Sequence, residues 1–480
     1  MITEKQIIGL LNNWDILNIE SHFIYYYIKF KKIDYSKSRL LNDYFKNFTL
    51  NKSLFNSLQT FELSTIKHLE NSLELIIPND DRKLNGAFFT PNYIVDFIIN
   101  TIKPQENEKN LDPSCGRGAF LVGLVNYYKT TYNKSIKRTI QENLFGADLM
   151  TYNIKRTKLI LSIFALENNE IIENDDFNLI VQDSIRADWK SIFSQSKGFD
   201  NIIGNPPYVK FQDLSEENRN FLSKNYKTIK NGTFNLYFAF FELGFNLLSK
   251  NGKLGYITPN NYFTSLAGQP LRLFFQSKQC IYRIVDFKSK KVFNAQTYTA
   301  ITFLDKKDNS ELLYDKIPDN LEPNQFLKNV NGSPNKLSDL NPKKWRLLKK
   351  TEQQNIKNIE TLGQPIGQLF NIAVGVATLK DEIYFIDTQD NTNDYYVKIH
   401  NDKKYLIEKD ITKTIYKISD FKKQKDVIHN KRRIIFPYKT KKGNAVALTE
   451  NEIKEKFPKT YEYFLAVRAE LEKRDKGKKV

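Results

Sequence analysis

Between about residues 86 and 305, short apolar runs alternate with stretches in which apolar residues have helical spacing. This alternation is typical of βαβ units, which build a parallel or mostly parallel sheet. We therefore expect an α/β fold in which a central sheet is flanked by helices. The runs that we expect to form or to contain strands lie at 110–114, 144–149, 178–185, 199–208, 253–259, 282–287 and 300–305.

The sequence on either side of this region has a different character. Residues 1–84 show helical spacing of apolar residues without a strong strand signal, so we expect an N-terminal helical region. Residues 307–360 are polar and interrupted by four prolines, which indicates a linker or a peripheral segment. A new apolar pattern begins at 361 and predicts a second domain of α/β or α+β type over 361–480. The first domain is then 85–306.

Several classes of protein are excluded by composition. The two cysteines, Cys115 and Cys280, and four scattered histidines rule out a disulfide scaffold and a zinc site of usual spacing, and we expect no metal. The N-terminus lacks the features of a signal peptide, and no run approaches about 18 apolar residues. We therefore expect a cytoplasmic protein without a membrane partner.

The net charge of +18 is concentrated near the end of the chain. Residues 421–480 contain 18 basic and 8 acidic side chains, which is a net +10. Aromatic residues lie between the basic runs, and positive charge beside flat rings suits a polyphosphate partner. A solvated lysine-rich face remains the alternative. The candidate nucleic-acid contacts are Lys431, Arg432 and Arg433.

The segment LDPSCGRGAF, residues 111–120, predicts a strand that ends in a tight turn before a helix. Gly116 and Gly118 would let the backbone approach a ligand, and the helix N-terminus offers unpaired N–H groups. Ligands of open α/β sheets bind at this end of the strands. The turn lacks the Lys-Ser/Thr pair of a P-loop NTPase. An ordinary βα loop is the alternative.

Two acidic residues follow the next two expected strands. Asp148 follows LFGA and Asp183 follows LIVQ. A carboxylate at a strand end can accept hydrogen bonds from ribose hydroxyls, and one a strand later can reach an adenine amino group. Each alone could be an ordinary loop acid, but in register with the glycine turn the two predict a nucleoside-shaped cleft.

The most specific feature is the tetrapeptide Asn205-Pro206-Pro207-Tyr208, directly after the expected strand 199–203. Two prolines make a stiff turn without N–H donors. The Asn205 side chain and the Pro206 carbonyl offer two acceptors, while Tyr208 offers a flat apolar face. That set suits a planar group that carries an amine, since two acceptors can hold both protons and turn the lone pair toward an electrophile. An ordinary turn is the alternative.

In this order, LDPSCGRGAF, GADL, VQDS and FDNIIGNPPYV resemble the motifs of amino-methyltransferases that depend on S-adenosyl-L-methionine. NGAFFTP at 85–91 resembles the motif that precedes the glycine turn in adenine-N6 DNA methyltransferases. The arrangement is similar to the γ class (TaqI-type, including type IIG restriction–modification enzymes). The resemblance is strong over 85–305 and loose over 360–480. It implies a Rossmann-like methyltransferase sheet followed by a target-recognition domain.

The resemblance also implies residue roles. Asp148 would bind the ribose hydroxyls of the cofactor and Asp183 its adenine, while the target adenine would be flipped out of the duplex into the pocket. Phe293 matches loosely the second aromatic residue that sandwiches the flipped base. The implied cofactor-binding residues are Thr90, Pro91, Asp112, Pro113, Cys115, Gly116, Gly118, Asp148 and Asp183. The implied catalytic residues are Asn205, Pro206, Pro207, Tyr208 and Phe293.

The function implied is site-specific adenine-N6 methylation of double-stranded DNA in a restriction–modification system, with a separate restriction endonuclease as a candidate partner. Residues 1–84 lack a convincing nuclease motif, so we expect no cleavage by this chain, and an incomplete recognition domain stays open. Three alternatives remain: a protein glutamine-N5 methyltransferase, an N4-cytosine DNA methyltransferase, and a catalytically inactive DNA-binding specificity subunit. The motif before the glycine turn and the basic C-terminal extension favour adenine in DNA as the methylated substrate.

Overall fold

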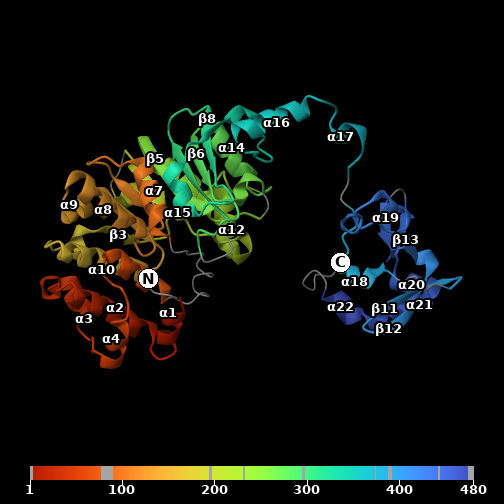
Figure 1. The fold of residues 1–480 in the computed structure, drawn as a ribbon, viewed down its shortest axis with the longest axis horizontal. Helices are drawn as coiled ribbons and strands as arrows, with labels where there is room; N and C mark the ends of the chain where they lie inside the picture. Colours follow the sequence, from red (N-terminus) through yellow and green to blue (C-terminus); the bar gives the residue numbers. More distant parts are fainter. Residues whose placement is uncertain are drawn as a thin grey trace. The chain divides into compact units, whose positions relative to one another are not determined.

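The computed structural model describes residues 4–76, 90–193, 197–230, 233–293, 298–372, 375–387, 392–441 and 444–473. The chain divides into two compact units, Met1–Gly363 and Gln364–Val480 (Figure 1). The first unit contains the motifs expected to carry chemistry, and the second contains most of the basic C-terminal region.

The first unit is built on a nine-stranded sheet with the order β3-β2-β1-β4-β5-β7-β6-β8-β9. Strands β1 to β5 pair in parallel, whereas β7 is antiparallel to both β5 and β6. This confirms the expected α/β fold with a mostly parallel sheet. The strands are β1 (Asn110–Asp112), β2 (Leu144–Asp148), β3 (Asn178–Val181), β4 (Phe199–Gly204), β5 (Leu248–Pro259), β6 (Ile281–Asp286), β7 (Thr299–Asp305), β8 (Glu311–Lys316) and β9 (Ser333–Lys336).

The strand order reverses at β1, which lies between β2 and β4. The chain runs outward from β1 through β2 to β3, and then returns across β1 to begin the other half of the sheet at β4. Crossover connections therefore leave β1 and β4 in opposite directions, and such a switch point opens a crevice at the carboxyl ends of the strands. The expected glycine turn and the Asn-Pro-Pro-Tyr tetrapeptide follow these two strands.

Helices cover the sheet, and its central strands are buried as a result. All seven residues of β7 are buried, and α13 buries nine of its eleven residues. None of the described helices combines the length and the apolar character that crossing a bilayer requires. The helices of this part of the chain are α7 (Asn92–Ile102), α8 (Ala119–Tyr132), α9 (Ile136–Asn143), α10 (Thr151–Glu167), α11 (Trp189–Phe193), α12 (Glu216–Asn225), α13 (Tyr237–Leu247) and α14 (Gln269–Ser277).

The N-terminal helices share the core of the sheet. One continuous hydrophobic cluster runs from Ile7 to Leu347, and helices α3 and α5 contact α10. Figure 1 shows α1 to α4 gathered together below α10. A buried ion pair joins Glu20 of α2 to Arg156 of α10. These helices are α1 (Glu4–Leu11), α2 (Ile16–Phe30), α3 (Arg39–Phe45), α4 (Lys52–Leu58) and α5 (Ile66–Leu75).

The segment 307–360, expected as a linker or a peripheral segment, forms one edge of the central sheet. It contains β8 and β9, which extend the central sheet, with the short helix α15 (Pro323–Phe326) between them and α16 (Lys350–Glu360) after β9. Pro334 lies in β9, the edge strand, where a missing N–H costs no interior ladder bond. The prolines that indicated a break are therefore compatible with the sheet.

The second unit is an α+β assembly with a small core of its own. Its buried cluster contains Ile383, Ile407 and Tyr463, and α21 packs on β12. The strands are β10 (Phe385–Ile386), β11 (Tyr395–His400), β12 (Lys403–Glu408), β13 (Thr412–Thr414), β14 (Arg433–Ile435), β15 (Tyr438–Lys441) and β16 (Asn444–Ala447). The helices are α17 (Ile366–Leu369), α18 (Asp381–Tyr384), α19 (Gln424–Ile428), α20 (Glu450–Lys456), α21 (Pro458–Ala466) and α22 (Arg468–Glu472).

The Glu20–Arg156 pair predicts a large stability difference. Arg156→Ala leaves the buried carboxylate of Glu20 without its partner, which should lower the free energy of unfolding by about 3–5 kcal/mol. The exposed pair Arg138–Glu142, at 3.1 Å, is the control, and Arg138→Ala should cost less than about 1 kcal/mol. Denaturant titration of both variants measures the difference. Equal losses would contradict a role for the buried pair in holding the N-terminal helices.

Candidate active site

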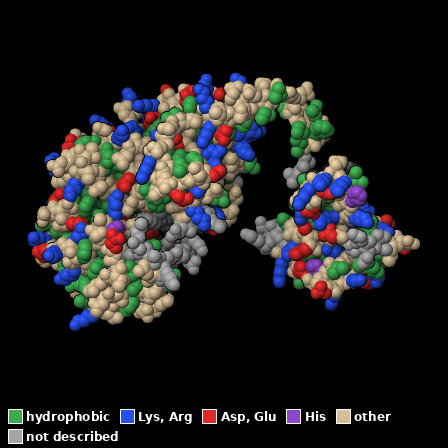
Figure 2. Space-filling view, viewed as in Figure 1, with side chains coloured by type: hydrophobic (Ala, Val, Ile, Leu, Met, Phe, Trp, Pro, Cys, Tyr) green, Lys and Arg blue, Asp and Glu red, His purple; other side chains and the backbone are tan. Residues whose placement is uncertain are grey.

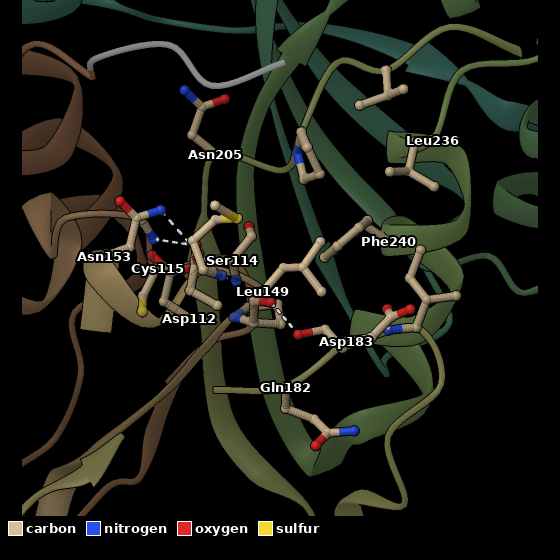
Figure 3. Close-up of a pocket in the computed structure, with 18 of the residues that line it drawn as sticks. Asp112, Ser114, Cys115, Leu149, Asn153, Gln182, Asp183, Asn205, Leu236 and Phe240 are labelled. Atoms are coloured by element: carbon tan, nitrogen blue, oxygen red, sulfur yellow. Dashed lines mark hydrogen bonds between the residues drawn. The ribbon is translucent and has the colours of Figure 1, made fainter. Parts of the chain in front are cut away.

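A cavity of about 350 Å³ lies at the carboxyl ends of β1 to β4. Figure 3 shows Asp112, Asp183 and Asn205 around it, each from the end of a different strand. Its volume is in the range of cavities that hold small molecules or cofactors. The residues expected from the sequence that line it are Thr90, Asp112, Pro113, Cys115, Gly116, Asp148, Asp183, Asn205 and Pro207. Pro91, Gly118, Pro206, Tyr208 and Phe293 are described but do not line it.

The glycine turn forms one wall of the cavity. The Cys115 N–H donates to the carbonyl of Ala147 at 2.9 Å, which ties the turn to β2. Gly116 and Gly118 have φ of +52° and +88°, a region that side chains rarely adopt. A Cβ at Gly118 would also lie 2.6 Å from Cγ2 of Thr157. Helix α8 begins directly afterwards with no side-chain cap, so its first N–H groups are left for another acceptor.

Asp148 is held in one orientation by three N–H donors. Its Oδ2 accepts from the backbone of Gly116 at 2.9 Å, and its Oδ1 accepts from the backbone of Met150 and from Nδ2 of Asn153, both at 2.9 Å. A carboxylate offers about four acceptor positions, so this one can also accept from a ligand hydroxyl. The turn and β2 therefore present an oriented acceptor to the cavity.

Asp112 is almost completely buried, with 1% of its surface exposed. Burial raises the pKa of its carboxyl to about 8, and the nearby charge of Asp148 adds to this, although the backbone N–H of Ser114 at 3.0 Å stabilises the charged form. A Cβ at Gly204 would lie 2.7 Å from Oδ1 of Asp112. Only glycine therefore lets β4 end so close to this carboxyl group.

Asp183 lies at a more open part of the cavity, at the end of β3. Its Oδ1 accepts from the Ile185 N–H at 3.1 Å, and its Oδ2 lies 3.5 Å from Nε of Arg186. Leu149, directly after Asp148, also lines the cavity and leaves 68% of its surface exposed. An exposed leucine beside two carboxylates offers apolar contact to a flat ring whose polar edges the carboxylates can bind. The sequence analysis did not single out Leu149.

The Asn-Pro-Pro-Tyr corner joins the motif that precedes the glycine turn. Nδ2 of Asn205 donates to Oγ1 of Thr90 at 3.1 Å, and Thr90 is buried. Pro91 immediately precedes α7. Residues 85–89 of the upstream motif lie outside the described residues. The hydrogen bond to Thr90 fixes which side of the amide carries the nitrogen, and the carbonyl oxygen of Asn205 is the atom that can accept a hydrogen bond from a ligand.

Tyr208 and Phe293 come together, but they do not form a sandwich. Their ring centroids are 6.2 Å apart at an interplanar angle of 60°, so the rings meet edge to face. The Tyr208 hydroxyl donates to the carbonyl of Ile257 at 3.2 Å, and both rings are buried. A base between them would need two nearly parallel planes with a gap, and this arrangement leaves none. Their implied role in stacking stays a prediction.

Helix α5 contributes two glutamates that the sequence analysis missed. Glu70 and Glu74 line the cavity and have 5% and 7% of their surfaces exposed. Glu74 forms an ion pair with Arg117 of the glycine turn. Their spacing of four residues places them on one face of a helix. Buried leucines lie on the same helix, and acids among such leucines are the feature of the sequence from which these two residues could have been predicted.

The three basic residues expected to contact nucleic acid have different surroundings in the second unit. Lys431 is exposed, whereas Arg432 pairs with Asp387 and Asp420. Arg433 donates to Thr414, and its guanidinium lies over the ring of Tyr396. On the face seen in Figure 2, Lys and Arg side chains gather over the part of this unit that carries α19. The exposed lysines in and beside α19 include Lys422, Lys423 and Lys425.

The raised pKa of Asp112 predicts a dependence of stability on pH. In the unfolded chain this carboxyl loses its proton near pH 4, whereas the folded state retains it to about pH 8, so its contribution to stability falls as pH rises through that window. Relative to the wild type, Asp112→Asn should gain unfolding free energy between pH 5 and 8, by up to about 1.4 kcal/mol per pH unit.

Denaturant titrations at three pH values check this prediction. The exposed Asp213 provides the control, because Asp213→Asn changes the same charge outside the cavity. If the difference between Asp112→Asn and the wild type is the same at pH 5 and pH 8, the buried carboxyl does not titrate in this window.

Residues 142–293 match the family described as Eco57I restriction-modification methylase. The chain is 26% identical over 464 residues to the type II restriction enzyme and methyltransferase RM.Eco57I of Escherichia coli, covering 82% of this chain and 46% of the relative. It is 30% identical over 326 residues to the type II methyltransferase M.AccI of Acinetobacter calcoaceticus, covering 61% of this chain and 56% of the relative. The chain thus spans about half the length of these relatives.

Among solved structures, the cryoEM structure of the DrdV–DNA complex has a TM-score of 0.50 to this chain. The sequence identity is 16%, and the match covers 73% of this chain and 42% of that chain. This likeness concerns the fold alone. The family model and the curated relatives confirm the resemblance to restriction–modification DNA methyltransferases that the order of the motifs indicated.

Proposed function

We propose that this chain is a site-specific DNA adenine-N6 methyltransferase of a restriction–modification system that uses S-adenosyl-L-methionine. The observation that carries the proposal is the hydrogen bond from Asn205 to Thr90, at 3.1 Å. It unites the two most specific motifs of the sequence at a cavity that also contains Asp148 and Asp183. The relatives RM.Eco57I and M.AccI, which are named as type II methyltransferases, support the same assignment.

The residues of the cavity fit this cofactor. Asp148 is oriented by three N–H donors and can accept from a ribose hydroxyl with its remaining position, while Asp183 can accept from the adenine amino group. Leu149 offers an apolar surface for the adenine ring. The glycine turn gives the backbone close access to the remainder of the molecule. When bound, the cofactor supplies an electrophilic methyl group on a sulfonium.

Asn205 and Pro206 orient the target amine. The side-chain carbonyl of Asn205 and the backbone carbonyl of Pro206 would accept hydrogen bonds from its two N–H groups, so that the nitrogen lone pair points into the cavity. Pro206 and Pro207 have no N–H to compete for these acceptors and restrict the backbone of the corner. Positioning supplies most of the rate in such a displacement, and no strong general base is required.

The target base would stack on Tyr208. A base inside a duplex must first be flipped out, at a cost of a few kcal/mol, and stacking on an aromatic ring returns about 1–3 kcal/mol. Because the rings of Tyr208 and Phe293 meet edge to face, one of them has to turn to admit the base. The Tyr208 hydroxyl donates to the carbonyl of Ile257, which fixes the edge of that ring farthest from its backbone.

The second unit would recognise the DNA sequence. Its exposed lysines near α19 suit phosphate contacts, and it holds a core of its own. The relative RM.Eco57I bears a name that combines a restriction enzyme with a methyltransferase, which supports a restriction endonuclease as a partner activity. We assign 364–480 to target recognition and the sheet of the first unit to methyl transfer.

Asn205→Ala should lower methyl transfer to DNA by about 100-fold or more, because one of the two acceptors that orient the amine is lost. Binding of S-adenosyl-L-methionine should remain, since the carboxylates that fit the nucleoside are unchanged. Transfer of labelled methyl groups to DNA and calorimetry of the cofactor measure the two effects. The exposed Asn358 provides the control, and Asn358→Ala should change neither.

Long-read modified-base sequencing of DNA from cells that express the chain tests the reaction itself. N6-methyladenine at one recurrent sequence would support the proposal. N4-methylcytosine, or methylated protein in place of DNA, would favour one of the alternative methyltransferases. A protein that binds no cofactor would fit an inactive specificity subunit. Full methyltransferase activity of Asn205→Ala would contradict the proposed role of the Asn-Pro-Pro-Tyr corner.

The exposed lysines predict a salt-dependent effect on DNA binding. Replacing Lys422, Lys423, Lys425 and Lys431 with Gln should weaken binding for every sequence and reduce the slope of log affinity against log salt, by up to about 0.9 for each phosphate that is no longer neutralised. Arg432 is unsuitable for this test, because its two carboxylate partners give it a structural role. Fluorescence anisotropy over a salt series provides the measurement. An unchanged slope would mean that these lysines form a solvated face.

A further inference from the structure

Helix α5 places two carboxyl groups in the cavity beside the glycine turn. Glu70 and Glu74 are one helical turn apart, both line the cavity, and both are more than nine-tenths buried. Burial of an ionised carboxylate is costly unless it is paired. Each glutamate therefore needs a cation or a proton.

The two glutamates differ in their partners. Glu74 pairs with Arg117, which also donates from Nε to the hydroxyl of Tyr152 at 2.9 Å. In the parts of the chain that the structure describes, no hydrogen bond or ion pair engages the side-chain carboxyl group of Glu70. The nearest cation along the helix, Lys67, binds Asp96 at 3.2 Å. Burial and the charge of Glu74 raise the pKa of Glu70 to about 8.

The position of Glu70 indicates which part of a ligand it would meet. Asp148 and Asp183, which fit the nucleoside, follow β2 and β3. Arg117 belongs to the glycine turn, and its partner Glu74 fixes α5 at that side of the cavity. A nucleoside bound at the two aspartates would direct the rest of the molecule toward the turn and α5. In the proposed cofactor, the rest of the molecule is an amino acid with a cationic α-ammonium group.

We propose that Glu70 binds the α-ammonium group of the cofactor's amino-acid portion, and that the Glu74–Arg117 pair positions α5 for this contact. The inference rests on the proposed use of S-adenosyl-L-methionine. It makes the N-terminal helical region part of the cofactor site, rather than a separate support for the sheet. The ammonium group would be the positively charged partner that the Glu70 carboxylate needs. A charge-assisted hydrogen bond between two such groups is among the stronger hydrogen bonds.

Calorimetry with two ligands that cannot be turned over tests the proposal on the full chain. S-adenosylhomocysteine has the amino acid with its α-ammonium, whereas 5′-methylthioadenosine has the same nucleoside and thioether without the amino acid. Glu70→Gln should lower the affinity for S-adenosylhomocysteine by roughly tenfold to a hundredfold and leave the affinity for 5′-methylthioadenosine unchanged. The control Glu216→Gln removes an exposed carboxylate at the start of α12 and should change neither affinity.

Several results of these titrations would overturn the proposal. Unchanged affinity of Glu70→Gln for S-adenosylhomocysteine would show that the carboxylate does not contact the amino acid. Equally weaker binding of both ligands would indicate a structural role for Glu70. Glu70→Asp retains the charge, so under the proposal it should recover part of the affinity for S-adenosylhomocysteine and leave the affinity for 5′-methylthioadenosine unchanged. If the wild type binds 5′-methylthioadenosine and not S-adenosylhomocysteine, the proposed role of Glu70 is contradicted, whereas the nucleoside site is supported. If it binds neither, the proposed function itself fails.

Discussion

The site depends on the close approach of two strand ends. β1 ends at Asp112 and β4 ends at Gly204, and the absence of a side chain at Gly204 leaves room for the Asp112 carboxyl. Any larger residue would place its Cβ 2.7 Å from Oδ1 and push the strands apart at the point where the chain turns into the Asn-Pro-Pro-Tyr corner. The corner and the glycine turn share one cavity because this contact is possible.

Different side chains serve the two edges of the parallel strands. At the amino ends, asparagine amides satisfy backbone carbonyls: Nδ2 of Asn178 donates to Leu144, and Nδ2 of Asn110 donates to Asn143. At the carboxyl ends, carboxyl groups line a cavity. The amides complete backbone hydrogen bonds at one edge, whereas the carboxyl groups at the other edge face a space that a ligand can enter.

The alternation of strands and helices, the glycine turn and the acids at the strand ends were predictable because each depends on neighbouring residues in the sequence. Other features depend on contacts between distant segments. The β9 strand contains Pro334, which favours a break unless the strand is known to lie at an edge. Arg432 belongs to a basic run, yet its partners Asp387 and Asp420 come from other segments. Glu70 resembled any acid on an amphipathic helix until α5 was placed against the glycine turn.

The separate core of the second unit has an evolutionary consequence. Its buried residues, among them Ile383 and Tyr463, pack against one another within residues 364–480. A unit that carries its own packing can be inherited as a cassette, because an exchange near residue 363 leaves the interior of the sheet intact. Under the proposed function, exchange of this unit between relatives would change the DNA sequence that is recognised and leave the cavity of the first unit unchanged.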